Sequence, residues 1–153
     1  MINFLVTFLF KIIELFTQNF YEFKVYKKSV VCNRKIPNSH SNICLLMQGP
    51  LIEKKNFTFE SLKWYKSCNP DISIIFSTWN SQNQNTIKKL RNLGIYVIEN
   101  DLPKVKGIVN INLQIISTNL GLNFAEHKNF QYVLKTRSDQ RIYEYKSIFS
   151  FFL

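Results

Sequence analysis

The sequence predicts an α/β protein in which helices flank a mainly parallel sheet. Short apolar runs of strand length alternate with segments of helical periodicity, and Gly, Pro, Asn or Asp residues separate them. The chain has 153 residues, of which 46% are hydrophobic and 20% charged, as is typical of a globular domain with one core. Polar clusters directly follow the apolar runs, at the edge where parallel α/β sheets hold ligands.

The expected elements begin near residue 43. The strands are four apolar runs, at residues 43–47, 72–76, 95–98 and 131–135. The helices lie between them, at residues 58–68, 85–92 and 110–122. We expect Gly94 to end the second helix and Gly121 to lie near the end of the third, because glycine closes helices readily. The third helix carries Ile111, Ile115 and Leu122 as its apolar residues.

The N-terminal part is expected to form a separate segment. Residues 1–26 are apolar at helical spacing, but Lys11 and Glu14 leave the run shorter than the roughly 18 uncharged residues of a membrane-spanning helix. A signal peptide is not indicated. Two interpretations stay open, a helix packed on the domain and a helix lying in a membrane interface. Residues 27–42 are polar and typical of a linker, and residues 43–153 form the expected domain.

Charge and cysteine content narrow the class of partner. The formal net charge of +10 favours an anionic partner. Because the basic residues are scattered and form no RNA-binding signature, nucleic acid is not the expected partner. Cys32, Cys44 and Cys68 are too few for a disulfide scaffold and too widely spaced for a zinc knuckle, so a reducing compartment is expected.

The first polar cluster is Gln48-Gly49-Pro50, at the end of the first expected strand. Glycine lets a ligand approach the backbone closely, and proline fixes the direction in which the chain leaves. A plain strand-ending turn explains the tripeptide as well. The chain contains neither GxGxxG nor GxxxxGK[ST], which disfavours a Rossmann dehydrogenase and a P-loop enzyme.

Two further clusters follow the second and third expected strands. Thr78 and Trp79 place a hydroxyl and an indole at the end of the second strand, where Trp79 could stack on a base or sugar, or simply pack in the core. Asn100 and Asp101 end the third strand. They could bind ribose hydroxyls, and an Asx-turn explains them equally well.

The fourth cluster contains Lys135, Arg137 and Asp139, which alternate along the chain and would project to one side of an extended strand. A carboxylate between cations stays ionised and can bind Mg²⁺ or Mn²⁺, while the cations can meet phosphate oxygens. Such a group suits a nucleoside diphosphate. A surface ladder of ion pairs is the alternative.

As an ordered set, these segments resemble the WavE lipopolysaccharide-synthesis family. The resemblance lies in LMQGP (46–50), IIFSTW (74–79), NDLP (100–103), NINLQIIST (110–118), GL (121–122) and YVLKTRSD (132–139). It covers about residues 43–142. Each segment is short, and their order and spacing carry the likeness.

The resemblance implies a GT-A-like, Rossmann-like domain that binds a nucleotide-sugar donor and transfers the sugar to a glycan or lipid-linked acceptor. It implies work in bacterial surface-polysaccharide synthesis, in the cytoplasm or peripherally at the inner face of the membrane, with contact through residues 1–26. It implies Mg²⁺ or Mn²⁺ as cofactor at Asp139, and no catalytic residue is assigned. The implied donor-binding residues are Gln48, Gly49, Pro50, Thr78, Trp79, Asn100, Asp101, Asn112, Gln114, Lys135, Arg137 and Asp139.

Family members continue well beyond the acidic motif, whereas this sequence closes soon after it with the apolar residues 148–153. We therefore expect a truncated or split chain without the acceptor half. A non-catalytic fragment or a membrane-associated binding module is the alternative function.

Overall fold

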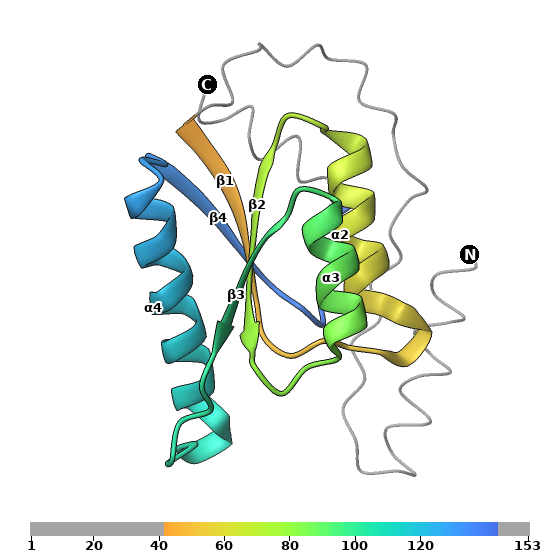
Figure 1. Ribbon diagram of the computed structural model, residues 1–153. Helices are drawn as coiled ribbons and strands as arrows, with labels where there is room; N and C mark the ends of the chain where they lie inside the picture. Colours follow the sequence, from red (N-terminus) through yellow and green to blue (C-terminus); the bar gives the residue numbers. More distant parts are fainter. Residues whose placement is uncertain (1–41, 144–153) are drawn as a thin grey trace, which may run out of the picture. The chain divides into compact units, whose positions relative to one another are not determined.

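The computed structural model describes residues 42–143, so the expected N-terminal helix and nearly all of the linker lie outside the described residues. Four strands form one sheet in the order β3-β2-β1-β4, and all three neighbouring pairs are parallel (Figure 1). The strands are β1 (Ile43–Gln48), β2 (Ser73–Trp79), β3 (Tyr96–Asn100) and β4 (Tyr132–Arg137). The α/β class with a parallel, Rossmann-like sheet is thus confirmed.

Helices cover both faces of this sheet. They are α2 (Phe57–Cys68), α3 (Gln84–Asn92) and α4 (Ile111–His127), with short 3-10 turns η2 (Lys54–Asn56) and η3 (Ile108–Asn110). Figure 1 shows α2 and α3 on one side of the sheet and α4 on the other. No helix within residues 42–143 combines the length and the apolar content needed to cross a membrane.

The strand order reverses between β1 and β4. From β1 the chain adds β2 and then β3 on one side, and it returns through α4 to place β4 on the other side of β1. In the register of this pair, Gln48 lies beside Arg137 at the carboxyl ends of the two strands. A reversal of this kind leaves a crevice where open α/β sheets hold their ligands.

Large apolar side chains pack the face under α2 and α3. The strands contribute Leu45, Met47, Ile74 and Phe76, and the helices contribute Leu62, Tyr65, Ile87 and Leu90. Each is fully buried, and burying a side chain of this size contributes about 1.5–3 kcal/mol. Gly94 has φ 75° just after α3, as expected of a residue that ends a helix.

The face under α4 is packed by small residues. Ser117, Gly121 and Ala125 are the buried residues of α4, and a Cβ atom added at Gly121 would collide with the Leu46 side chain of β1. The expected position of Gly121 near a helix end is wrong, because the helix continues to His127 and uses the glycine for close contact with the sheet. The three apolar residues expected to mark this helix are about half exposed: Ile111, Ile115 and Leu122.

Candidate functional site

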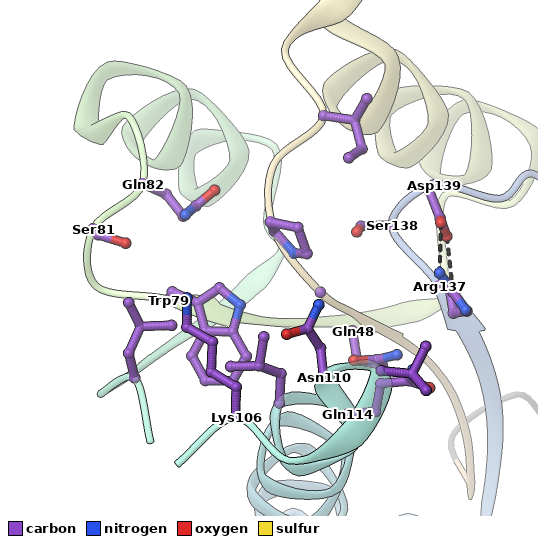
Figure 2. A pocket seen from close by; sticks show the side chains of 16 residues that line it. Gln48, Trp79, Ser81, Gln82, Lys106, Asn110, Gln114, Arg137, Ser138 and Asp139 are labelled. Carbon is purple, nitrogen blue, oxygen red and sulfur yellow. Dashed lines mark hydrogen bonds and ion pairs between the residues drawn. The ribbon is translucent and has the colours of Figure 1, made fainter. Parts of the chain in front are cut away.

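A pocket of about 430 Å³ lies at the carboxyl edge of the sheet (Figure 2). Its wall comes from the segments that follow all four strands and from the start of α4. Seven of the residues expected from the sequence line it: Gln48, Gly49, Pro50, Trp79, Gln114, Arg137 and Asp139. The first, second and fourth polar clusters therefore meet in one hollow, although they are far apart in the chain.

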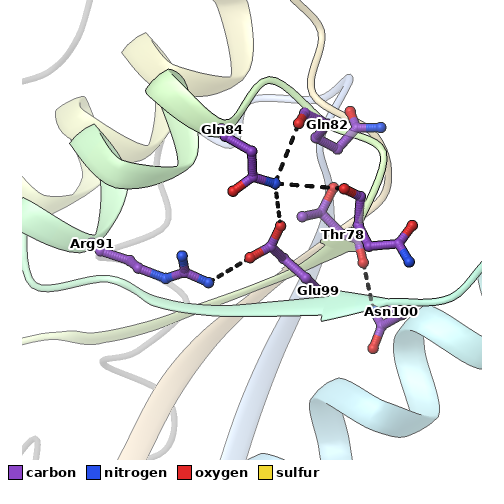
Figure 3. Close-up of polar contacts among 7 residues, drawn as sticks. Thr78, Gln82, Gln84, Arg91, Glu99 and Asn100 are labelled. Carbon is purple, nitrogen blue, oxygen red and sulfur yellow. Dashed lines mark hydrogen bonds and ion pairs between the residues drawn. The ribbon is translucent and has the colours of Figure 1, made fainter.

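Thr78 and Asn100 do not line the pocket, because they are built into the sheet. Both are buried, and the Asn100 amide donates to the Ser77 hydroxyl at 2.9 Å and to the Thr78 carbonyl at 2.7 Å (Figure 3). These bonds join the ends of β2 and β3. The Thr78 hydroxyl is enclosed and has no partner among the described residues.

Asp101, Asn112 and Lys135 also lie outside the pocket wall. The Asp101 carboxylate accepts from the Asn80 amide at 2.5 Å, and the Asn112 amide donates to the Val105 carbonyl at 3.0 Å, so both stabilise loops. Lys135 is exposed on β4.

The expected alternation of the fourth cluster stops where β4 ends, at Arg137. Beyond it the chain turns, and the Gln140 N–H donates to the Arg137 carbonyl at 3.1 Å. This turn brings the Asp139 carboxylate back onto the Arg137 side chain (Figure 2). The two groups therefore face each other, and they are not held in parallel by a continuing strand.

Gln48 is held rigidly at the floor of the pocket. The residue is only 3% exposed, and its side-chain oxygen lies 2.7 Å from the Ser117 hydroxyl of α4, whose single proton it shares with the Leu113 carbonyl, also at 2.7 Å. Within residues 42–143, no group accepts a hydrogen bond from its NH₂. A buried amide normally satisfies both ends, so an amide with one end fixed and the other at a pocket is a candidate ligand contact.

Trp79 and Ser138 repeat this pattern. Both line the pocket, they are 3% and 2% exposed, and neither the indole N–H nor the hydroxyl has a hydrogen-bond partner in the described part of the chain. Most of the Trp79 ring is covered, so it offers an edge with a donor and no free face for stacking. Together with Gln48, these residues present three available donor groups to the pocket.

The charged residues of the wall are Lys106, Arg137 and Asp139. Arg137 and Asp139 form a two-point pair, with Nε–Oδ1 at 2.9 Å and Nη2–Oδ2 at 2.6 Å. The hydrogen bonds to Asp139, and then its charge, raise the pKa of Arg137. Lys106 makes no ion pair among the described residues. As far as the structure describes the chain, the wall carries two cations and one anion, and Lys106 is the cation without an ion pair.

The residues present do not fit a site in which the protein itself holds a divalent cation. Among the described residues of the wall, Asp139 is the one that is acidic, and both of its oxygens already accept from Arg137. Within residues 42–143, no three His, Cys, Asp or Glu side chains gather in a way that could hold a metal ion. The Mg²⁺ or Mn²⁺ expected from the sequence thus stays a prediction that this geometry does not support.

Backbone hydrogen bonds join the strand ends at the pocket. The Gly49 N–H donates to the Ser77 carbonyl at 3.0 Å, and the Ser138 N–H donates to the Gln48 carbonyl at 2.9 Å. Gly49 has φ 123°, and a Cβ atom there would lie 2.5 Å from the Ser138 hydroxyl oxygen. Only glycine fits this approach without strain, which explains its place after β1.

The backbone of the pocket wall is strained at η3. Val109 has φ 52° although it is β-branched, and Asn110 follows with φ 60°. Such conformations cost roughly 1–3 kcal/mol each and cluster at functional sites. Val109 is 86% exposed, so this part of the wall is an apolar surface open to solvent.

The cysteine and histidine residues of the described part offer no nucleophile or base at the pocket. Burial in the sheet raises the pKa of the Cys44 thiol to about 12, which keeps it protonated at neutral pH. Cys68 and His127 lie on α2 and α4, and neither lines the pocket.

Several residues that line or support the pocket were not expected from the sequence, among them four with polar side chains, Lys106, Ser138, Gln82 and Ser117. Lys106 is one of two lysines in a short loop, and Ser138 lies within the YVLKTRSD segment. The Gln82 side chain accepts a hydrogen bond from the Leu51 N–H at 2.7 Å. Ser117 lies on α4 and contacts the Gln48 side chain. Of these four, only Ser138 could have been found from the sequence, because it lies between Arg137 and Asp139.

No family model matches the chain, and comparisons with curated proteins and with solved structures found no match either.

Proposed function

We propose that this chain carries the donor-binding part of a glycosyltransferase of the WavE type. It would bind a nucleoside diphosphate sugar and serve transfer of the sugar to a glycan or lipid-linked acceptor in bacterial surface-polysaccharide synthesis. The observation that carries the proposal is the meeting of Gln48, Trp79 and Arg137 in one pocket at the reversal of strand order.

The composition of the pocket suits such a donor. Lys106 and Arg137 supply positive charge for a diphosphate, and the donors of Gln48 and Ser138 can meet phosphate or sugar oxygens. Leu102 and Val109 give the wall an apolar side against which a base can lie. The volume of about 430 Å³ falls within the range of roughly 300–1,000 Å³ that is common for small-ligand sites.

The proposal is tested by isothermal titration with UDP-, GDP-, CDP- and ADP-sugars, with and without Mn²⁺. We expect one nucleotide class to bind, and Arg137→Gln to weaken that binding roughly tenfold or more, as loss of a charge-assisted contact does. Lys88→Gln, which removes an exposed cation of α3 outside the pocket wall, is the matched control. If no sugar nucleotide binds the folded protein, the non-catalytic fragment or binding module replaces the transferase.

Peripheral membrane contact at the cytoplasmic face is a separate part of the proposal. Residues 1–26 would lie in the interface through their apolar side chains. Co-sedimentation with liposomes should then fall when these residues are deleted. Equal sedimentation of the full chain and the deletion variant would leave the segment as a packing helix.

A further inference from the structure

Three buried side chains leave donor groups open at the pocket. Gln48 offers its NH₂, Trp79 its indole N–H and Ser138 its hydroxyl, and each belongs to a side chain that is at least 97% buried. Among the described residues, none of these donors has an acceptor. Donors fixed in buried side chains are arranged before a ligand arrives, so they favour a ligand rich in acceptors.

The charges of the pocket point the same way. Among residues 42–143, Lys106 makes no ion pair, and Arg137 pairs only with Asp139, two residues away. This pair is about half exposed, with side-chain exposures of 45% and 44%, and ion pairs in such positions contribute little stability. A phosphate group can bind the same guanidinium in two-point fashion, so exchanging the carboxylate for a phosphate costs little.

We infer that the pocket binds the diphosphate of its ligand through its own cations and donors, without a bridging divalent cation, and that Asp139 holds Arg137 until the anion displaces it. The inference rests on the proposed function in taking a diphosphate as the ligand. It reverses the role expected for Asp139 from the sequence, because a carboxylate that coordinated a metal would assist binding. Here the carboxylate competes with the phosphate for the guanidinium.

Inorganic pyrophosphate is the probe, titrated into the full chain in EDTA and again in Mn²⁺. We expect binding in EDTA, with no higher affinity in Mn²⁺. Arg137→Gln should weaken it roughly tenfold or more, since a two-point charged contact is lost. Asp139→Asn should strengthen it by a factor of about three to ten, because a competitor and a like charge are removed at contact distance.

Two matched controls separate this effect from a change in net charge. Asp71→Asn removes an exposed acid just before β2, at the opposite edge of the sheet, and Lys88→Gln removes an exposed cation of α3. Both should change pyrophosphate affinity by less than about twofold, since distant exposed charges are screened by salt. Circular dichroism of each variant establishes that it is folded.

The outcomes for the inference and for the proposed function can be told apart. Pyrophosphate binding that requires Mn²⁺ and is lost in Asp139→Asn overturns the inference, even if a sugar nucleotide binds. Metal-independent binding that strengthens in Asp139→Asn upholds it, and the proposed function then fails alone if no sugar nucleotide binds. An equal gain in Asp71→Asn and Asp139→Asn also overturns it.

Discussion

The carboxyl edge of the sheet has two halves that look alike in sequence and differ in structure. At the ends of β2 and β3, the Asn100 amide is consumed by bonds to Ser77 and Thr78. At the ends of β1 and β4, Gln48 and Ser138 keep donors without acceptors in the described part of the chain. The closed half, formed by Ser77, Thr78 and Asn100, holds the edge together, and the open half, together with Trp79 of β2, is available to a ligand.

The closed half extends to the outer edge of the sheet. Glu99 of β3 accepts from Gln84 and from Arg91 of α3, each at 2.6 Å (Figure 3). These contacts join β3 to the helix that precedes it. Polar residues at the strand ends of this protein thus either join elements of the fold or remain open to a ligand. Their hydrogen-bond partners distinguish the two roles.

The largest expected effect comes from breaking the closed half. Asn100→Ala removes two donors and leaves the Ser77 hydroxyl and the Thr78 carbonyl buried with one bond fewer, so we expect a loss of about 3 kcal/mol in the free energy of unfolding. Urea denaturation measures it. Pyrophosphate affinity of the folded fraction should stay within about twofold, because the pocket wall is intact. A large loss of affinity with unchanged stability would reverse the assignment of the two halves.

A smaller loss of stability is expected where the open half is anchored. Ser117→Ala removes the hydroxyl that contacts the side-chain oxygen of Gln48. This should cost about 1–2 kcal/mol in the free energy of unfolding and weaken pyrophosphate binding several-fold. The control is Ser67→Ala, whose hydroxyl bonds only to the Trp64 carbonyl on an exposed side of α2. If both variants bind pyrophosphate with the affinity of the unmodified protein, the contact with Ser117 is not needed to position Gln48.

The strands and two of the helices could be predicted from the sequence because they rest on local signals. Continuous apolar runs end at residues that break regular structure, and β1 and β2 lie within about three residues of the expected ranges at either end. Helix α4 was harder to predict, because large apolar residues usually mark the buried face. Here Gly121 and Ala125 mark it, since the helix lies close to the sheet.

The candidate site could be predicted in position and not in detail. Each cluster follows a strand, and parallel strands end at one edge, so the meeting of Gln48, Trp79 and Arg137 follows from topology. Whether a polar group is open depends on residues far along the chain. Ser117 lies 69 residues from the Gln48 amide that it fixes, and no local pattern relates the two.

Lowering the pH weakens the contacts of Glu99 in the closed half without removing a side chain. The hydrogen bond from Gln84, with help from Arg91, lowers the pKa of Glu99 from its ordinary value of 4.5. A carboxyl whose pKa is lowered by folding adds stability above its unfolded pKa and loses it as the pH falls through the folded value. Between pH 5 and 3, in about that window, Glu99→Gln should flatten the fall in unfolding free energy by about 0.5 kcal/mol, since such pairs are screened by solvent. Urea denaturation at each pH, with Glu60→Gln of α2 as a control, measures the difference.

The smallest expected effect defines the border of the open half. Lys135 and Arg137 lie two residues apart on β4, and both were expected to bind the donor, yet only Arg137 lines the pocket. Lys135→Gln should therefore lower pyrophosphate affinity by less than about twofold at 0.15 M salt, because an exposed lysine outside the pocket wall acts on the anion only through a charge that salt partly screens. Titration of Lys135→Gln and Arg137→Gln side by side measures the gap. Equal losses would place the bound anion along the outer edge of β4, where the alternation read from the sequence would have put it.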